Sequence, residues 1–306
     1  MSEPRHQDPL PLGGEGDLPY SKGLLARALI ATGVPAARAY ELALRAEQDL
    51  AARGETALDL GRLEQLAGDV LGADQGSRAV HRLRSYRELQ QLDVPIIVLI
   101  GGGTGSGKST VATEVAYRLG ITRVTSTDIV RQTMRAFFSR AFMPSIHYSS
   151  FEAAGAGLAA DEETSDPVLL GFLDQTRNVL VGVRAVIERA LQEGWSMVLE
   201  GVHLVPGLVP PVEGALFVHC VLAVEDERLH ADHFWVRDVA SEGLRPMTRY
   251  LDALGDIRFI QEFIVARARR AGTPVVENSA AERTIATVME LVLTSAARLE
   301  TIGAGG

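Results

Sequence analysis

Residues 94–110 have the sequence VPIIVLIGGGTGSGKST, and this segment carries the clearest fold signal in the chain. Its first part, residues 94–100, is a short, continuous and β-branched run, which is typical of a parallel strand buried on both faces. The glycines after it satisfy the pattern GxxxxGK followed by Ser or Thr, and a helical pattern, KSTVATEVAYRL, begins at Lys108. A strand, a glycine-rich loop and a helix in this order predict a loop that binds phosphate.

The residue types in this loop suit the triphosphate of a nucleotide. Glycines let backbone N–H groups converge on phosphate oxygens without Cβ clashes, and the helix N-terminus adds the positive end of its dipole. We expect the Lys108 ammonium to reach the β- and γ-phosphates and the Ser109 hydroxyl to coordinate Mg²⁺, so the predicted cofactors are ATP and Mg²⁺. The predicted nucleotide-binding residues are Gly102, Gly103, Thr104, Gly105, Ser106, Gly107, Lys108, Ser109 and Thr110.

The use of lysine also singles out Lys108. The chain has 30 lysines and arginines, and only Lys22 and Lys108 among them are lysines. A chain that uses arginine almost everywhere is expected to keep lysine where a compact ammonium does what a planar guanidinium cannot. The alternative is a glycine-rich turn with its lysine in solvent, and the strand, loop and helix in register argue against it.

Outward from this loop, short apolar runs alternate with long helical segments. Such alternation predicts an α/β domain with a parallel sheet flanked by helices. The further strand candidates are TRVTSTD (122–128), SMVLEG (196–201), ALFVHCVLAV (215–224) and TPVVEN (273–278).

The part of the chain before residue 93 has a different pattern. Apolar residues recur at three-to-four spacing in residues 21–33, 35–54, 56–72 and 76–90, which predicts four helices. Ser21 and Thr56 are candidate N-caps, and Pro35 suits a first helical turn. We therefore predict a flexible lead-in rich in Pro, Gly and acid over residues 1–18, a small all-α domain over residues 19–92, and the α/β domain over residues 93–306.

The composition narrows the classes of partner. The 306 residues carry a formal net charge of −9, which argues against binding duplex nucleic acid. The single cysteine, Cys220, excludes an internal disulfide and a cysteine-rich zinc site. No apolar run approaches the ~20 residues of a membrane span, and the first residues do not resemble a signal peptide. We expect a cytoplasmic protein that acts on a small molecule, and the sequence leaves its oligomeric state open.

Candidate catalytic residues lie where strands end, because α/β sheets bind ligands at the carboxyl ends of their strands. Asp128 ends one strand candidate, and Arg131 follows it by one helical turn. This pair is suited to orienting an acceptor hydroxyl and holding the anionic group of the acceptor. The alternative for Asp128 is a plain helix N-cap.

A second acid, Glu200, ends the strand candidate at 196–201 and is followed by His203. Glu200 is a candidate for holding a metal-bound water or acting as a base, and its alternative is a strand-end charge in solvent. His203 is a candidate for contacting substrate phosphate or for a structural hydrogen bond. The predicted metal-associated residues are Ser109, Asp128 and Glu200.

Arginines gather in the downstream part of the chain, at Arg228, Arg237, Arg245, Arg249 and Arg258. Phosphoryl transfer needs cations that close over the migrating group. Arg245 and Arg249 are preferred because SEGLRPMTRY has the character of a mobile connection. We predict Arg249 as a catalytic residue and Arg245 as a substrate-binding one, and surface ion pairs are the alternative.

The segment MPSIHYSSFEA (143–153) interrupts the helical pattern with hydroxyl and imidazole groups. This density of donors suits a small, multiply charged and hydroxylated acid. The alternative is a polar loop held by its own hydrogen bonds. Residues 154–167 after it are expected to be a flexible insertion, and Gln175 is a candidate to face the same pocket. The predicted substrate-binding residues are Arg131, His147, Tyr148, Ser149, Ser150, His203 and Arg245.

Several stretches taken together resemble the 2-phosphoglycerate kinase family. They are PYSKGLLARALIATG (19–33), GGTGSGKSTVATEVAYRLGITRVTSTDIVRQTMR (102–135), FMPSIHYSSFEA (142–153), VLEGVHLVPG (198–207), RYLDALGDIRFIQEFIVARA (249–268) and TPVVEN. The resemblance implies a P-loop fold of the nucleoside- and shikimate-kinase-like type, and a kinase that phosphorylates 2-phosphoglycerate to 2,3-bisphosphoglycerate with ATP.

The resemblance also implies that the helical domain is similar to the ATP-cone, a regulatory nucleotide-binding module. An ATP-cone opens with a basic hairpin, whereas residues 1–18 here are acidic and rich in proline and glycine. A second nucleotide site is therefore left open, with Lys22 as the residue to carry it, and the alternative is that the helical domain is only a structural cap. Two other functions stay open for the whole chain: a kinase of another polyol or inositol phosphate, and a nucleotide-dependent regulatory switch.

Overall fold

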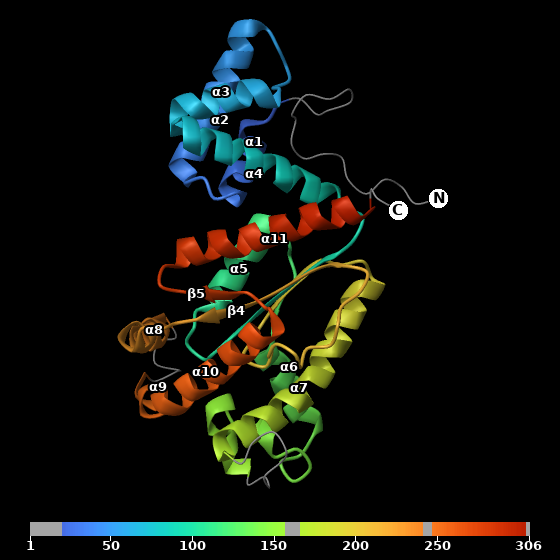
Figure 1. The fold of residues 1–306 in the computed structure, drawn as a ribbon, viewed down its shortest axis with the longest axis vertical. Helices are drawn as coiled ribbons and strands as arrows, with labels where there is room; N and C mark the ends of the chain where they lie inside the picture. The colour runs from blue at the N-terminus through green and yellow to red at the C-terminus, as the bar shows by residue number, and fades with distance from the viewer. Residues whose placement is uncertain (1–19, 157–165, 241–246, 304–306) are drawn as a thin grey trace. The chain divides into compact units, whose positions relative to one another are not determined.

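The computed structural model describes residues 20–156, 166–240 and 247–303, which are drawn as ribbon in Figure 1. The chain divides into two compact units, Met1–Asp93 with Met289–Gly306, and Val94–Val288. The predicted lead-in, Arg245 and most of the predicted insertion at 154–167 lie outside the described residues. The predicted domain boundaries stay predictions.

The first unit contains the four predicted helices, α1 (Lys22–Ala31), α2 (Ala36–Arg53), α3 (Leu60–Leu71) and α4 (Ala73–Gln91). Ser21 caps α1 as expected, since its Oγ accepts from the Leu24 amide at 3.4 Å. Thr56 as the cap of α3 is wrong, because α3 begins at Leu60 and the Asp59 carboxylate accepts from the Arg62 amide at 2.8 Å. Pro35 occupies the N-cap of α2, one residue before the first turn.

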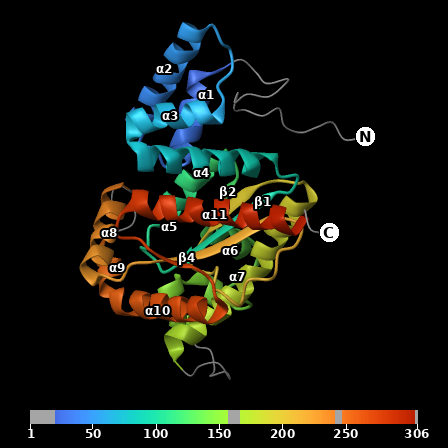
Figure 2. The same ribbon diagram turned by 45° about the horizontal axis from the view of Figure 1, so that its top comes forward.

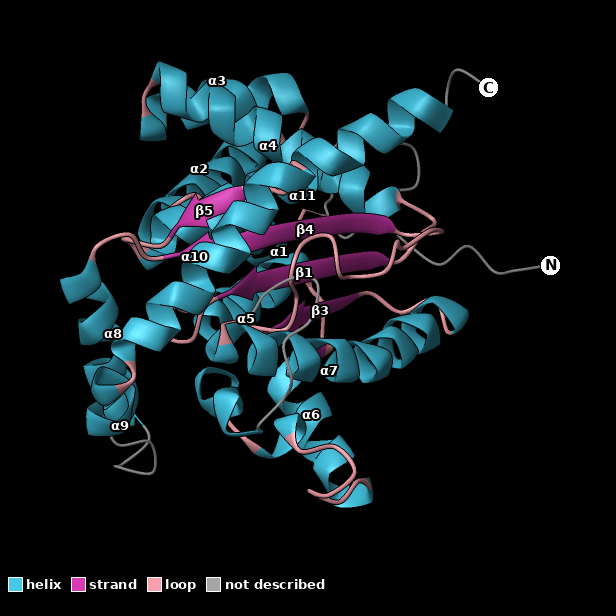
Figure 3. Ribbon diagram, turned by 60° about the horizontal axis from the view of Figure 1, so that its bottom comes forward, coloured by secondary structure: helices cyan, strands magenta, loops and turns pink. Residues whose placement is uncertain are grey.

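The second unit is built on a five-stranded sheet in which the predicted strands all form. They are β1 (Ile96–Gly102), β2 (Val124–Ser126), β3 (Met197–Glu200), β4 (Leu216–Ala223) and β5 (Val275–Glu277). All neighbouring strands are parallel, in the order β2-β3-β1-β4-β5, and Figure 3 shows β5, β4, β1 and β3 side by side. The predicted α/β fold with a parallel sheet is confirmed.

Helices lie between most of the strands, although residues 201–215 between β3 and β4 form none, and the last helix follows β5. The helices are α5 (Lys108–Leu119), α6 (Thr127–Phe137), α7 (Pro167–Gln192), α8 (Glu227–Ala240), α9 (Met247–Asp252), α10 (Leu254–Ala271) and α11 (Ala281–Gly303), with two short 3₁₀ helices at Ser145–His147 and Ser150–Ala156. In Figure 1, α7 and α10 lie below the strands and α5 above them. No helix within the described ranges is long and apolar enough to span a membrane.

The core of the sheet explains why β1 is apolar throughout. Ile97 and Leu99 pack with Leu199 of β3 and with Val179 and Val183 of α7, in one buried cluster. A second buried cluster joins Val221 of β4 to α10 through Ile257, Ile260 and Ile264. Every residue of β1 is buried, as expected for the central strand of a parallel sheet.

The register brings the strand ends to one edge. Glu200 at the end of β3 is level with Ile100 of β1 on one side and with Ser126 of β2 on the other. In the sheet, β1 lies between β3 and β4. From β1 the chain crosses to β2 and β3 on one side, and then returns to β4 and β5 on the other, so the end of β1 is the point where the strand order reverses. Open α/β sheets bind ligands in the crevice at this point.

Candidate active site

The phosphate loop leaves β1 at Gly102 and enters α5 at Lys108, as the motif predicts. Gly105 has a φ of +81° and Gly107 a φ of +79°, in the left-handed region that favours glycine. An added Cβ at Gly107 would come within 2.2 Å of the Asn278 Nδ2. The conformation of the loop therefore depends on its glycines both for backbone angle and for space.

Lys108 is 8% exposed and lies against its own loop. Its Nζ donates to the Gly103 carbonyl at 2.5 Å and to the Ser106 Oγ at 3.4 Å. A lysine in solvent does not fit this placement. The ammonium is held where the loop turns, at the N-terminus of α5.

Ser109 and Glu200 are brought together from elements that lie far apart in the sequence. The Ser109 Oγ donates to the Glu200 Oε1 at 3.0 Å. Glu200 is 8% exposed, so the alternative of a strand-end charge in solvent does not fit. A hydroxyl and a carboxylate in contact at the mouth of a phosphate loop are oxygen ligands of the kind that Mg²⁺ prefers.

Asp128 lies in the first turn of α6 and pairs with Arg131. The Arg131 Nε and Nη2 lie 3.3 and 3.2 Å from the Asp128 Oδ1. Partial desolvation by itself would raise the pKa of the Asp128 carboxyl, but His203, the charge and hydrogen bond of Arg131, and the charge of Lys108 together hold the pKa below its ordinary value. The plain N-cap alternative is wrong, because the cap is Ser126, whose Oγ accepts from the Ile129 amide at 3.2 Å.

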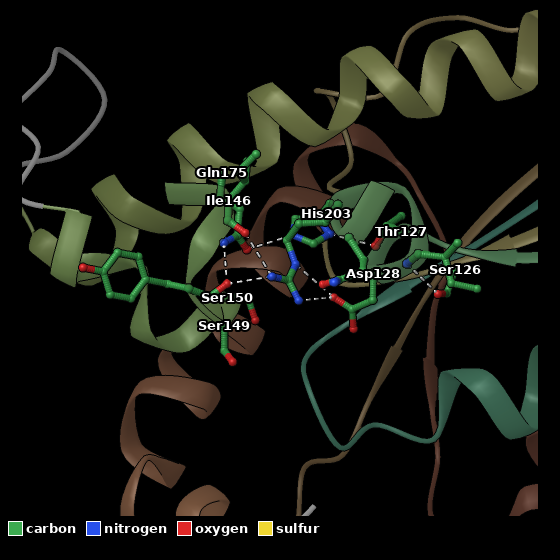
Figure 4. Close-up of polar contacts among 12 residues, drawn as sticks. Ser126, Thr127, Asp128, Ile146, Ser149, Ser150, Gln175 and His203 are labelled. Atoms are coloured by element: carbon green, nitrogen blue, oxygen red, sulfur yellow. Dashed lines mark hydrogen bonds and ion pairs between the residues drawn. The ribbon is translucent and has the colours of Figure 1, made fainter. Parts of the chain in front are cut away.

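His203 is fully buried and bonded at both ring nitrogens, as Figure 4 shows. The Nδ1 lies 2.7 Å from the Thr127 Oγ1, and the Nε2 lies 2.9 Å from the Gln175 Oε1. Burial lowers the pKa of His203 to about 3, so the ring is neutral. Since an amide oxygen only accepts, Nε2 carries the proton and Nδ1 accepts from the Thr127 hydroxyl.

Gln175 extends this network to the polar segment 143–153. Its Nε2 donates to the carbonyls of Ser145 at 2.6 Å and Tyr148 at 3.1 Å. Arg131 donates to the carbonyls of Ile146 at 3.1 Å and Tyr148 at 2.9 Å. The polar segment is thereby joined to α6 through Arg131 and to α7 through Gln175.

The hydroxyl and imidazole groups of the polar segment point in different directions. The His147 Nε2 donates to the Phe138 carbonyl at 2.9 Å, and the Tyr148 hydroxyl donates to the Gly155 carbonyl at 2.8 Å. Ser150 is buried, with its Oγ 3.4 Å from the Thr104 Oγ1 of the phosphate loop. Of these residues, Ser150 contacts the phosphate loop, whereas His147 and Tyr148 form their hydrogen bonds with nearby residues of the segment between α6 and α7.

Arg249 of α9 reaches the same segment. Its Nε and Nη2 make a two-point ion pair with the Glu152 carboxylate at 3.0 and 2.6 Å, and its Nη2 donates to the Ser149 Oγ at 2.9 Å. The Arg249 hydrogen bond is the main cause that lowers the pKa of Glu152. Arg258 donates to the Glu225 carbonyl at 2.9 Å and is thereby held at the end of β4.

Known proteins resemble this chain in sequence over most of its length. No family model matches the chain. The 2-phosphoglycerate kinase of Pyrococcus horikoshii is 35% identical over 92% of this chain and 92% of its own length. Those of Thermococcus kodakarensis and Methanothermobacter thermautotrophicus are 37% and 39% identical, over 89% of this chain and 92% and 89% of their own lengths. This chain belongs to the 2-phosphoglycerate kinase family. It is a P-loop kinase, a phosphotransferase with a hydroxyl acceptor.

Two solved structures also align with this member of the 2-phosphoglycerate kinase family. A gluconokinase from Sinorhizobium meliloti aligns over 70% of this chain and 99% of its own, at 16% identity and a TM-score of 0.37. A shikimate kinase from Acinetobacter baumannii in complex with shikimate aligns over 67% of this chain and 97% of its own, at 17% identity and a TM-score of 0.39.

Mg²⁺, the metal expected beside a phosphate loop of this type, fits the residues present. Among the described residues, no group of three or more His, Cys, Asp or Glu side chains could hold a metal by itself. Mg²⁺ is usually bound by one or two carboxylates together with phosphates and waters, so a complete protein cage is not expected. Ser109 and Glu200, in contact with each other, are the donors that would hold it.

Sequence reasoning missed three side chains that contact the phosphate loop. His230 and His233 of α8 and Asn278 after β5 bond to the carbonyls of Thr104, Gly105 and Ser106. One signal was available, since His230 and His233 are three residues apart and share a helix face in the segment after a strand. In this member of the 2-phosphoglycerate kinase family, the loop is thus surrounded by partners from outside the motif.

Proposed function

We propose that this kinase transfers the γ-phosphoryl group of ATP to the hydroxyl of 2-phosphoglycerate and gives 2,3-bisphosphoglycerate. The observation that carries the proposal is the Asp128–Arg131 ion pair. It lies on the same side of the sheet as the Ser109–Glu200 contact at the phosphate loop. A carboxylate suits the acceptor hydroxyl, and a guanidinium suits the carboxylate or phosphate of the acceptor. The names of the relatives support the identity of the acceptor.

In the proposed reaction, a bond forms between the acceptor hydroxyl oxygen and the γ-phosphorus. The bond from that phosphorus to the bridging oxygen breaks, and ADP leaves with the electron pair. The proton of the hydroxyl passes to Asp128, in the first turn of α6, or to Glu200, at the end of β3. Phosphoryl transfer depends mostly on positioning and charge neutralisation, so no covalent intermediate with the enzyme is needed.

The proposal assigns the binding of phosphates, metal and acceptor to particular residues of the site. The loop amides and Lys108 hold the phosphates, while Ser109 and Glu200 would hold Mg²⁺, which when bound would neutralise charge on the phosphate oxygens. Asp128 orients the hydroxyl, and Arg131 and Arg249 supply positive charge on the acceptor side. An open groove of about 520 Å³, lined by Ser109, Thr110, Thr113, Glu114, Ala281, Glu282 and Ile285, lies beside the start of α5 and supports placement of the nucleoside there.

The test is a coupled assay of ADP release, run with 2-phosphoglycerate, 3-phosphoglycerate and glycerate as acceptors, with and without Mg²⁺. We expect turnover with 2-phosphoglycerate that depends on Mg²⁺, and ³¹P spectra that show 2,3-bisphosphoglycerate. The 3-phosphate isomer is the matched control, because it has the same charge and composition and only exchanges the positions of the hydroxyl and the phosphate. Little turnover is expected with 3-phosphoglycerate or glycerate.

Each other outcome overturns the proposal in its own way. Turnover with an inositol or polyol phosphate but not with 2-phosphoglycerate would assign a different acceptor. Tight ATP binding without transfer to any acid or polyol would favour a nucleotide-dependent switch.

A further inference from the structure

Four successive carbonyls of the phosphate loop each accept a hydrogen bond from a side chain. The pairs are Gly103 O with Lys108 Nζ at 2.5 Å, Thr104 O with His230 Nε2 at 2.7 Å, Gly105 O with His233 Nδ1 at 2.8 Å, and Ser106 O with Asn278 Nδ2 at 2.9 Å. Three of these four donors lie outside the motif. Two of them, His230 and His233, come from one helix, α8.

A hydrogen bond to a backbone carbonyl also fixes the direction of the N–H group in the same peptide unit. In a planar trans peptide, the C=O of one residue and the N–H of the next point to opposite sides. A donor that holds the carbonyl of Thr104 or Gly105 therefore sets the direction of the N–H of the following residue. Glycines on their own leave this direction undetermined, because they move freely between left- and right-handed backbone angles. The loop needs its amides set in advance if they are to meet phosphate oxygens without further ordering.

The protonation state of His230 is clear from its surroundings. Its side chain is fully buried and stacks on Phe234, with ring centroids 5.4 Å apart. Burial lowers the pKa of His230 to about 4, so the ring is neutral near pH 7. The partner is a carbonyl, which only accepts, so the proton of the neutral ring lies on Nε2. Its Nδ1 has no hydrogen-bond partner among the described residues.

His233 continues the same face of α8 one turn later and donates through its other ring nitrogen, Nδ1. Phe234 closes the space beneath the loop, since an added Cβ at Gly105 would come within 2.5 Å of its Cζ. Phe234 in turn stacks on Tyr250 of α9, with ring centroids 5.0 Å apart. Figure 2 shows α8 and α9 side by side. One face of α8 is thus fitted to the phosphate loop.

We propose that His230 and His233 are positioning residues that orient the peptide groups of loop 103–107 for a triphosphate, so that α8 is part of the nucleotide site. The inference rests on the proposed function, in which this loop binds ATP. The two histidines touch the loop backbone and act on the nucleotide through it. Affinity for ATP, rather than for the acceptor, is the property they determine.

The test uses amide side chains that replace one ring nitrogen at a time. A glutamine places its N–H₂ near the position of Nε2, and an asparagine places its own near Nδ1. His230→Gln and His233→Asn therefore keep the donor, whereas His230→Asn and His233→Gln lose it. We expect the Kd for ATP, measured by calorimetry, to rise roughly three- to tenfold in the two variants that lose the donor. The two variants that keep it should stay within about twofold of the unchanged protein.

His219→Asn is the matched control, because His219 Nε2 donates to the carbonyl of Leu204, outside the loop, at 3.2 Å. It should leave the Kd for ATP unchanged, and the KM for the acceptor should be unchanged in all five variants. Equal Kd values for Gln and Asn at both positions would overturn the inference, since the rings would then only fill space. If a variant at the buried position 230 fails to fold, the half-buried His233 pair decides the question. A protein that binds no ATP before substitution would instead refute the proposed function.

Discussion

The Lys108 ammonium is a positive charge that the phosphates need, and it is largely buried, which costs free energy of desolvation. Lys108 is 8% exposed and donates to Gly103 O, so it is held at the loop before any phosphate arrives. Lys108→Ala is expected to lower kcat by at least about 100-fold, since it removes a charge from the transferring phosphates. The urea midpoint should change little. Turnover near that of the unchanged protein would show that this loop is not the working site.

Asp128 is assigned to the acceptor side, and its side chain is 64% exposed. Asp128→Asn keeps the shape and removes the charge that pairs with Arg131. We expect kcat to fall by more than the KM for ATP rises, because the carboxylate acts on the acceptor hydroxyl. Steady-state kinetics with ATP and acceptor varied separately make the measurement. The reverse pattern, with the main effect on the KM for ATP, would assign Asp128 to the nucleotide.

Among the helices, the acceptor side of the site depends on a contact between α9 and the polar segment. Arg249 of α9 and Glu152 of the second 3₁₀ helix form the link between the helices after β4 and the polar segment. Both side chains are exposed, and ion pairs of this kind contribute little to stability. Their relation to activity is therefore separable from folding.

The prediction is that Arg249→Gln lowers kcat/KM for the acceptor by roughly 10- to 100-fold, because a positive charge near the migrating group is lost. Glu152→Gln removes the partner and keeps the arginine, so it serves as the control and should retain most activity. Unfolding midpoints of both variants should match that of the unchanged protein. Equal losses in the two variants would mean that the ion pair only holds α9 in place.

At the scale of the whole second unit, three histidines are kept neutral in the folded chain. Burial lowers the pKa of His203 to about 3 and those of His219 and His230 to about 4. In the unfolded chain each takes up a proton near its ordinary pKa of 6.5. Below that value the unfolded state binds protons that the folded state does not, so acidification favours unfolding.

We therefore expect the free energy of unfolding to fall as the pH drops from about 6.5 to about 4, by up to about 1.4 kcal/mol per pH unit for each histidine. Carboxylates whose pKa is lowered in the folded chain, such as Glu152 and Asp128, begin to lose their contribution only as the pH falls through their ordinary pKa values of 4.5 and 3.8. The two tryptophans, Trp195 and Trp235, both lie in the second unit, so their fluorescence in urea follows it. His219→Gln should reduce the pH slope by about one third, and an unchanged slope would contradict the assignment.

Much of the second unit was predictable because its signals are local. The β-branched run at 94–100, the glycine pattern and the start of a helix at Lys108 each depend on residues close in sequence, and each formed as expected. The strand candidates that end at Glu200 and near Asp128 were correct for the same reason. Thr56 failed as a cap because Asp59, nearer to the first apolar residue of the helix, makes the same hydrogen bond.

By itself, the sequence determined the parallel strands, the phosphate loop and the places of Glu200 at the end of a strand and Asp128 just after one, since these follow from periodicity, steric freedom and the order of elements. Only the tertiary structure decided which side chains meet them. Ser109 and Glu200 are 91 residues apart, Thr104 and His230 126 apart, and Ser106 and Asn278 172 apart. Such pairs depend on strand order, register and the packing of crossover helices, and a local pattern carries no information about any of these.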